Sequence, residues 1–130
     1  MRFVHVSIRA KDMDKSIDFY SRHFGMMLER RREIKANDAE IAFLTSEGSD
    51  LRLEITHYRK QKKFDQAPYE DRAWDHLAFE VDDMKAVIER LKKEKVTVTD
   101  EPFRLGPDGP LIAFIEDPVG VLIELIERRS

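Results

Sequence analysis

Two histidines and two glutamates lie at matching points of a repeated sequence, and these residue types can bind a metal ion. Sliding the second half of the chain over the first by 71 positions brings His76 onto His5 and superimposes two copies of the tripeptide Ile-Ala-Phe. A one-residue shift in the following turn brings Glu124 onto Glu54. Such a repeat is hard to obtain by chance, so we expect the four side chains to be related by a pseudo-two-fold axis.

Two imidazoles and two carboxylates form a ligand set that suits zinc, nickel, cobalt or manganese as divalent ions. In an octahedral arrangement they would leave two positions for water or for two substrate oxygens, which is a template for holding a hydroxycarbonyl compound. Taken singly, a histidine or glutamate on a strand is more often hydrogen-bonded or solvated than a ligand. One metal ion accounts for all four positions at once, whereas His23 and His57 have no such partner and are interpreted as structural.

The composition excludes several classes of protein. The 130 residues contain no cysteine, so disulfides, thiolate nucleophiles and cysteine-ligated zinc are absent. The net charge of −3 gives no basis for binding nucleic acid or an anionic membrane surface, and no apolar run reaches the length of a membrane span. Since no signal-peptide pattern precedes the first strand-like segment, we expect a cytoplasmic protein. The ligand set described above suits a small-molecule substrate.

The first half of the chain has the pattern βαβββ. A strand is predicted over 3–10, where apolar and polar residues alternate. Asp12 can cap a helix that ends at Gly25, and a strand over 27–34 follows. A hairpin over 41–56 then completes the first half, and its second arm carries Glu54.

The second half repeats this order. An alternating strand is predicted over 74–81, and Asp82 or Asp83 can cap the helix that follows. A further strand over 96–100 and a hairpin over 111–126 close the chain.

The last hairpin determines which way Glu124 points. Its turn contains Asp-Pro-Val-Gly, and Pro and Gly are turn formers. At period 2 the second arm places Ile123 and Leu125 on one face and Glu124 on the other, beside Leu122 and Ile126. A carboxylate among apolar neighbours indicates a functional role for Glu124.

Each half of the chain is too small to bury enough apolar surface for a stable core of its own. We therefore expect a single domain in which two repeats, approximately 1–57 and 74–130, share a core or borrow one from a second subunit. The polar segment 58–73 shows no sustained period and is interpreted as the linker between the repeats.

Four segments of this chain resemble the vicinal oxygen chelate superfamily. They are FVHVSIRAKDMDKSIDFYSRHFGM, LRLEIT, DHLAFEV and EDPVGVLIELIE. Over essentially its whole length the chain is most similar to the short bacterial type of glyoxalase I, lactoylglutathione lyase. The resemblance implies an α+β fold of two tandem βαβββ modules that form curved mixed sheets.

The resemblance also implies a site and a reaction. Its metal ligands would be His5, Glu54, His76 and Glu124, with nickel or cobalt favoured and zinc or manganese possible, in a homodimer whose sites are each built from both subunits. The reaction would convert the hemithioacetal of methylglyoxal and glutathione to S-lactoylglutathione. Proton transfer would pass through a metal-stabilised enediolate, with Glu124 as the principal base and Glu54 opposite it. Arg9 matches the arginine that meets a glutathione carboxylate.

Two positions depart from this family's usual pattern. Tyr58 stands where an asparagine usually follows the first ligand glutamate by four residues, and the last turn reads Asp-Pro-Val-Gly instead of Asp-Pro-Asp-Gly. A different thiol or a related substrate is therefore an open alternative to glutathione.

Two other kinds of function remain open. One is another metalloenzyme of the same superfamily, such as a methylmalonyl-CoA epimerase, a thiol transferase or an extradiol dioxygenase. Glu54 argues against these, because the epimerase pattern usually has Gln there and the other two generally use three protein ligands. The second is a metal-free module that binds small molecules on the same fold, and the intact ligand set counts against it.

Overall fold

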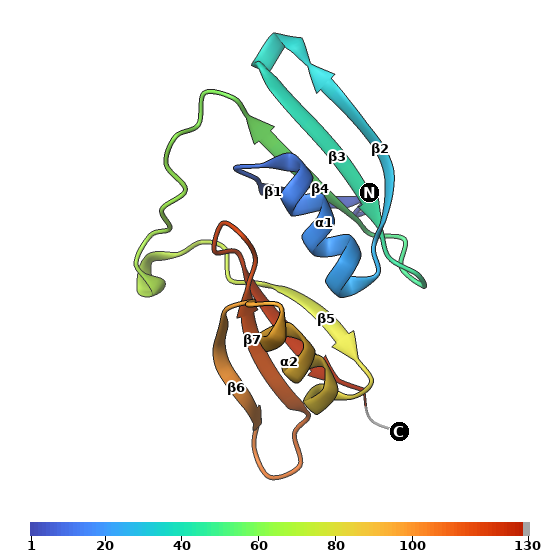
Figure 1. Cartoon of the computed structure of the whole chain (residues 1–130), viewed down its shortest axis with the longest axis vertical. Helices are drawn as coiled ribbons and strands as arrows, with labels where there is room; N and C mark the ends of the chain where they lie inside the picture. Colours follow the sequence, from blue (N-terminus) through green and yellow to red (C-terminus); the bar gives the residue numbers. More distant parts are fainter. Residues whose placement is uncertain (129–130) are drawn as a thin grey trace. The chain divides into compact units, whose positions relative to one another are not determined.

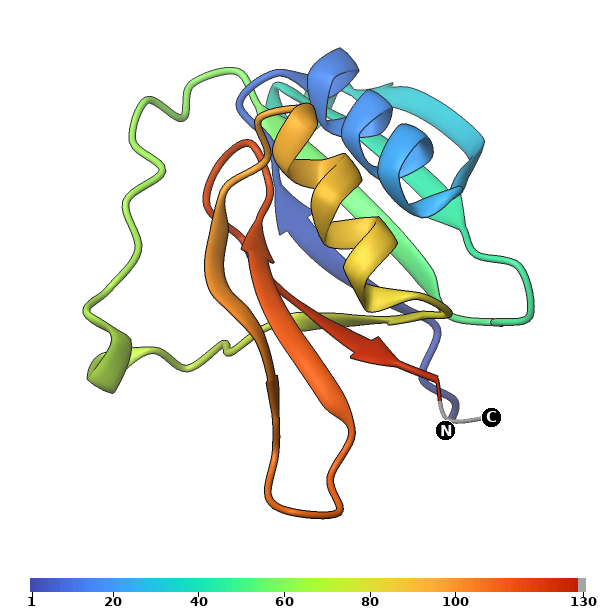
Figure 2. The same ribbon diagram turned by 60° about the horizontal axis from the view of Figure 1, so that its bottom comes forward.

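The computed structural model describes residues 1–128, and in it the chain forms two compact units, Met1–Asp65 and a second that begins at Gln66. Each unit is a four-stranded mixed sheet with one α-helix against one face (Figure 1). Figure 2 shows the same arrangement from a second direction. The predicted α+β class with two βαβββ modules is confirmed.

The first unit contains β1 (His5–Arg9), α1 (Met13–Phe24), β2 (Met27–Ile34), a 3₁₀ turn (Lys35–Asn37), β3 (Ala39–Thr45) and β4 (Arg52–Tyr58). The strand order is β1-β4-β3-β2, with β1 parallel to β4 and the other pairs antiparallel. Because short turns can join only antiparallel neighbours, β2, β3 and β4 follow one another as hairpins, whereas β1 reaches β4 through a longer crossover that contains α1.

The second unit contains a 3₁₀ turn (Tyr69–Asp71), β5 (Leu77–Val81), α2 (Met84–Lys93), β6 (Val98–Arg104), β7 (Leu111–Glu116) and β8 (Leu122–Glu127). The strand order is β5-β8-β7-β6, and β5 is parallel to β8. The second unit therefore repeats the topology of the first, strand for strand.

Both helices begin where the sequence predicts, and α1 also ends there. The Asp12 side chain accepts a hydrogen bond from the Lys15 N–H at 3.1 Å, and Asp83, not Asp82, accepts one from the Ala86 N–H at 3.1 Å. Gly25 ends α1 in the left-handed conformation, at φ 65°, which glycine adopts without steric cost. Among residues 1–128 no helix combines the length and the apolar character needed to cross a membrane.

The strands of the first unit separate apolar from polar side chains. Ile8, Leu53 and Ile55 are buried on the face that α1 covers. On the opposite face the Ser7 and Thr56 hydroxyls lie 3.0 Å apart. We call this opposite face the mixed face of the unit; the register of β1 and β4 places on it His5, Ser7, Arg9, Arg52, Glu54 and Thr56.

The same separation holds in the second unit. Ile123 and Leu125 are fully buried, and Glu124 points to the other face with Leu122 and Ile126, as predicted. On the mixed face of this unit Ala78 is the register partner of Glu124.

Two strand boundaries differ from the sequence-based prediction. β5 begins at Leu77 instead of position 74; Leu77 pairs with Ile123, and in this register positions 74 and 75 have no partner in β8, which begins at Leu122. β6 begins at Val98 instead of position 96, because the Val96 N–H still bonds to the Leu91 carbonyl at the end of α2. β6 also runs on to Arg104, and irregular pairing with β7 lets it accommodate a proline.

The turn between β7 and β8 depends on Asp117, whose carboxylate accepts hydrogen bonds from the Val119 and Val121 N–H groups, both at 2.9 Å. Asp117 is only 6% exposed. Replacing Asp117 with Ala should lower the free energy of unfolding by about 1–3 kcal/mol, because two partly buried N–H groups lose their acceptor. Urea denaturation measures this, with Asp82→Ala as an exposed control. Equal stability of the two variants would contradict this role of Asp117.

Candidate metal centre

His76 and Glu124 form the candidate pair in the second unit. The His76 Nε2 atom lies 3.7 Å from the Glu124 Oε1 atom, and the two side chains are 30% and 17% exposed. This distance is too long for a hydrogen bond. The two atoms therefore lie close together without being hydrogen-bonded to each other.

The separation fits two ligands of one ion. Zinc lies about 2.1 Å from imidazole nitrogen and carboxylate oxygen, so two such ligand atoms are about 3.0 Å apart at a right angle and about 4.2 Å apart when opposite. The 3.7 Å between His76 and Glu124 falls inside this range. One imidazole and one carboxylate also match the borderline-hard donors that zinc, nickel and cobalt accept.

His5 and Glu54 are the corresponding residues of the first unit. Both lie on the mixed face, where Glu54 is in register with Ser7, two residues after His5. The Glu54 carboxylate accepts a long hydrogen bond of 3.4 Å from the Thr56 hydroxyl. The parallel pairing of β1 with β4 thus brings together a histidine and a glutamate that are 49 positions apart in the chain.

Two phenylalanines, which the sequence analysis did not single out, contact the two histidines in the same way. The rings of His5 and Phe43 are 5.3 Å apart at 77°, and those of His76 and Phe114 are 5.5 Å apart at 78°. Edge-to-face contacts of this kind restrict ring orientation. The sequence feature that could have identified them is the repeated tripeptide Ile-Ala-Phe. Its phenylalanine is the cross-strand partner of Glu54 in the first sheet and of Glu124 in the second.

An ion pair on the mixed face of the first unit does not involve Glu54. Arg52, the register partner of His5, donates from Nε and Nη2 to Glu29 on β2 at 2.8 and 2.9 Å. These hydrogen bonds lower the pKa of Glu29 and raise the pKa of Arg52. Among residues 1–128 no basic side chain forms an ion pair with Glu54.

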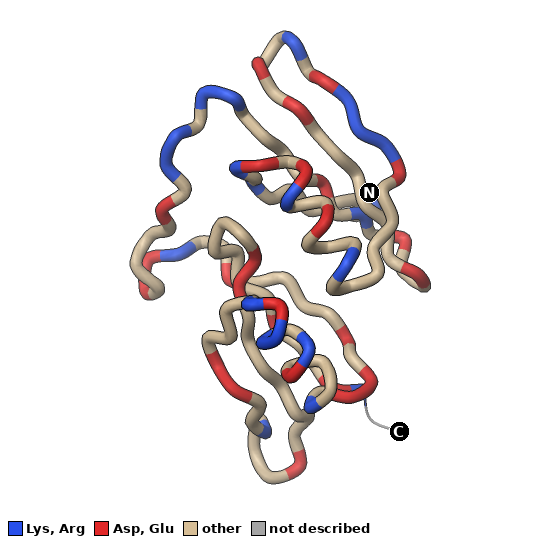
Figure 3. The backbone as a smooth tube through the Cα atoms, in the orientation of Figure 1, with Lys and Arg blue, Asp and Glu red and all other residues tan. Residues whose placement is uncertain are grey.

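Arg9 lies on the same mixed face and is held at two points. Its guanidinium carbon is 4.4 Å from the centre of the Tyr58 ring, and its Nη1 donates to the Gln61 Oε1 at 3.0 Å. Gln61 in turn donates to the Lys63 carbonyl at 2.9 Å. The segment that supplies these partners continues from β4 and is rich in basic residues, which Figure 3 shows as a blue run.

The two remaining histidines have contacts that agree with a structural role. The His57 Nδ1 atom is 2.9 Å from the Ala10 carbonyl oxygen, and the His23 ring stacks edge-on against Phe19 at 5.0 Å. Neither contact involves His5 or Glu54.

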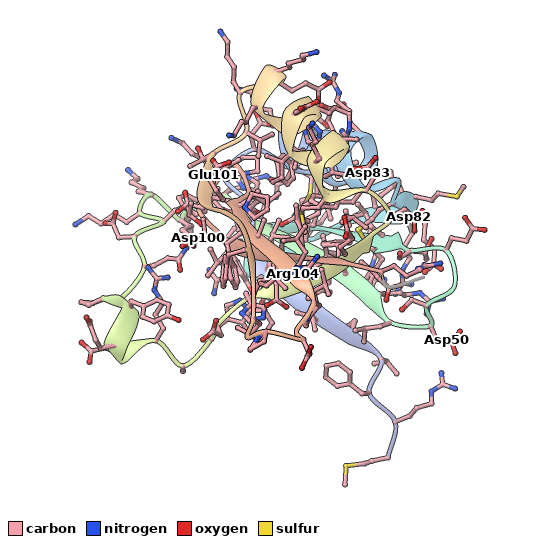
Figure 4. The ribbon with its side chains drawn as sticks, turned by 90° about the horizontal axis from the view of Figure 1, so that it is seen from below. Asp50, Asp82, Asp83, Asp100, Glu101 and Arg104 are labelled. Atoms are coloured by element: carbon pink, nitrogen blue, oxygen red, sulfur yellow. The ribbon has the colours of Figure 1, made fainter. Side chains whose placement is uncertain are left out.

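Three charged side chains of the second unit that Figure 4 labels, Asp83, Glu101 and Arg104, have local partners of their own. Glu101 on β6 pairs with Lys92 of α2 at 2.7 Å, and Arg104 donates to the Gly109 carbonyl at 3.3 Å. Asp83 caps α2. These contacts stabilise local structure, so the pair of His76 and Glu124 is distinct from them.

The structure thus places a histidine and a glutamate on one face of the sheet in each unit, and in the second unit the two side chains lie 3.7 Å apart. Within residues 1–128 no group of three or more His, Asp or Glu side chains is close enough to hold a metal ion. The predicted set of four ligands in one site therefore stays a prediction.

The fold, the repeat and the paired donors define a class of protein, and a family model agrees with them. The model of the Glyoxalase/Bleomycin resistance protein/Dioxygenase superfamily matches residues 2–125, so the chain belongs to this superfamily, as its sequence resemblance predicts.

Curated relatives with similar sequences are lactoylglutathione lyases. The enzyme of Neisseria meningitidis is 34% identical over 132 residues, which cover 100% of this chain and 93% of the relative. The probable lactoylglutathione lyase of Vibrio cholerae is 35% identical over 132 residues, which cover 99% of this chain and 92% of the relative.

Solved structures with the same fold include glyoxalase I enzymes. Maize glyoxalase I has a TM-score of 0.83 and 30% identity over 99% of this chain, although this chain spans only 45% of the maize protein. Glyoxalase I of Leishmania major, described as trypanothione-dependent, has a TM-score of 0.78 and 28% identity over 98% of this chain and 86% of its own.

Proposed function

We propose that this protein is a glyoxalase I-type lyase that depends on a divalent metal ion. It converts the hemithioacetal of methylglyoxal and a thiol, glutathione or another, to the S-lactoyl thioester. The observation that carries this proposal is the separation of 3.7 Å between His76 Nε2 and Glu124 Oε1, two donors that recur in the first unit as His5 and Glu54. The similarity to lactoylglutathione lyases over the full chain supports the same reaction.

His5, Glu54, His76 and Glu124 would hold the ion, with nickel or cobalt favoured and zinc or manganese possible. The bound ion supplies a Lewis acid that polarises the substrate oxygens and stabilises negative charge that develops on them. Both carboxylates repel each other when no cation is present, so binding of the ion is expected to stabilise the folded protein.

Glu124 is the principal general base. Its carboxylate is 17% exposed and has the apolar neighbours Leu122 and Ile126 on its own strand. Limited access to water keeps the abstracted proton near the substrate. Glu124 takes the proton from one carbon and returns it to the adjacent carbon, while Glu54 acts from the opposite side of the substrate.

Arg9 is proposed to bind a carboxylate of the thiol. Its guanidinium is already oriented by Tyr58 and Gln61, so little conformational freedom is lost when an anion binds. Tyr58 is also the residue that departs from the usual glutathione pattern. Glyoxalase I of Leishmania major is described as trypanothione-dependent, so enzymes with this fold differ in their thiol.

We also propose a homodimer whose sites combine His5 and Glu54 of one subunit with His76 and Glu124 of the other. Each unit has about 65 residues, and units of this size bury little surface alone. Pairing across a two-fold axis would make two identical sites per dimer. A complete functional domain then consists of the repeats 1–57 and 74–130 with their linker 58–73.

The test is an assay of metal-loaded protein. The apoprotein is loaded with nickel, cobalt, zinc or manganese, and methylglyoxal and glutathione are added at concentrations that form the hemithioacetal. Formation of the thioester is followed by its absorbance. We expect activity with at least one ion and none with the apoprotein. If no ion gives activity with glutathione or with other low-molecular-weight thiols, this function is wrong.

A further inference from the structure

Asp75 has a contact that neither the fold nor the four-ligand site requires. Its Oδ1 atom lies 2.6 Å from Nδ1 of His76, the next residue in the chain. The Asp75 side chain is 65% exposed. An exposed aspartate gains little from such a contact in terms of stability. The contact does, however, determine which of the two ring nitrogens carries the proton.

A neutral imidazole has one N–H donor and one nitrogen with an available lone pair. The carboxylate of Asp75 can only accept, so the proton is held on Nδ1 and the lone pair is left on Nε2. Nε2 is the nitrogen that lies 3.7 Å from the Glu124 Oε1 atom. Asp75 thus presents the correct nitrogen to the volume that His76 and Glu124 share. A carboxylate behind the ring also makes Nε2 a stronger donor.

The internal repeat shows that the fold does not need this aspartate. The shift of 71 positions that superimposes His76 on His5 places Asp75 on Val4. The first unit forms the same sheet with Val4, and among residues 1–128 the His5 ring makes no hydrogen bond. The two histidines share the phenylalanine contact, whereas only His76 has a carboxylate behind it. The contact between a carboxylate and the ring Nδ1 atom is therefore specific to His76.

We infer that Asp75 is a positioning residue for His76, which holds its Nδ1 proton and directs Nε2 to a divalent metal ion. This inference rests on the proposed function, since it concerns the same site. It assigns unequal roles to the two halves of the ligand set: His76 is oriented by a charged partner, and His5 by ring packing alone.

The first test is the tautomer of His76 in the apoprotein at a pH where its ring is neutral. Nitrogen-15 NMR of the four histidines distinguishes a protonated from an unprotonated ring nitrogen. We expect His76 of the wild type to carry its proton on Nδ1. Asp75→Asn keeps an oxygen acceptor and should retain much of this preference, whereas Asp75→Ala should lose it. The His5 signals should not change in either variant. An unprotonated Nδ1 in the wild type, or no change in Asp75→Ala, would overturn the inference.

The second test is metal affinity, measured by calorimetry with nickel, cobalt and zinc salts and the apoprotein. Loss of a partner that orients a ligand should weaken binding by about 10–100-fold in Asp75→Ala, with a smaller loss in Asp75→Asn. Asp82→Ala, which removes an exposed carboxylate at the other end of β5, is the matched control and should bind as the wild type does. Thermal melting of the apoproteins should show no difference among the three variants. Unchanged affinity in Asp75→Ala would overturn the inference.

The two tests separate this inference from the proposed function. Binding that depends on Asp75, without isomerisation of any hemithioacetal, would contradict the reaction and support the role of Asp75. Isomerisation by the wild type, with full metal affinity in Asp75→Ala, would support the reaction and contradict the role of Asp75. A wild-type protein that binds none of the ions would overturn both.

Discussion

Glu124→Gln is expected to lower kcat by about 10²- to 10⁴-fold, the usual contribution of a general base. The substitution keeps the size and one oxygen of the side chain but removes the charge that accepts a proton. It also removes an anionic ligand, so weaker binding of the divalent ion is expected at the same time. Steady-state kinetics at saturating metal ion separates the two effects, because metal binding is then no longer limiting.

Glu101→Gln provides the matched control for this prediction. Glu101 is an exposed glutamate of the same unit; it lies on β6 and forms an ion pair with Lys92 of α2. Its substitution should leave kcat within error of the wild type. If Glu124→Gln kept full activity with metal bound, the role of principal base would pass to Glu54 or be abandoned.

Two inactive variants are expected to restore activity when their subunits are exchanged. One carries His5→Ala and Glu54→Ala, and the other carries His76→Ala and Glu124→Ala. A heterodimer would contain one site with all four ligands and one site with none. Random exchange makes about half of the dimers heterodimers, and half of their sites are intact, so about a quarter of the wild-type activity should return.

The exchange experiment depends on evidence that exchange has occurred. Native mass spectrometry can follow heterodimer formation, provided that one variant carries a mass label. Activity should rise in proportion to the heterodimer. Complete exchange without any activity would show that each site is built within one chain, and the proposed assembly across subunits would be wrong.

The repeat made most of the fold predictable. Asp12, Gly25 and Asp83 are local signals for helix ends, and the structure places each of them where the sequence predicts. Hairpin turns are equally local. The predicted starts of β5 and β6 were less accurate. Strand ends depend on where the neighbouring strand begins and on the last turn of the preceding helix. These are tertiary effects that alternation along one segment does not contain.

The candidate site was only partly accessible from sequence for a similar reason. Residue type and the shift of 71 positions identify the histidines and glutamates, and parallel pairing places each histidine near its glutamate. The contacts of Phe43 and Phe114 depend on cross-strand register, which a single sequence does not specify. Asp75 precedes a candidate ligand, but only the side-chain geometry shows that it contacts Nδ1.

The most direct measurement of the central claim is a titration of apoprotein activity against bound metal. Increasing amounts of nickel or cobalt are added to the apoprotein, bound metal is measured by elemental analysis, and hemithioacetal isomerisation is measured on the same samples. The proposed site predicts that activity rises in proportion to bound metal and reaches its maximum at one ion per chain. Activity that is already maximal in metal-free protein, or one ion bound per chain with no activity, would contradict the account.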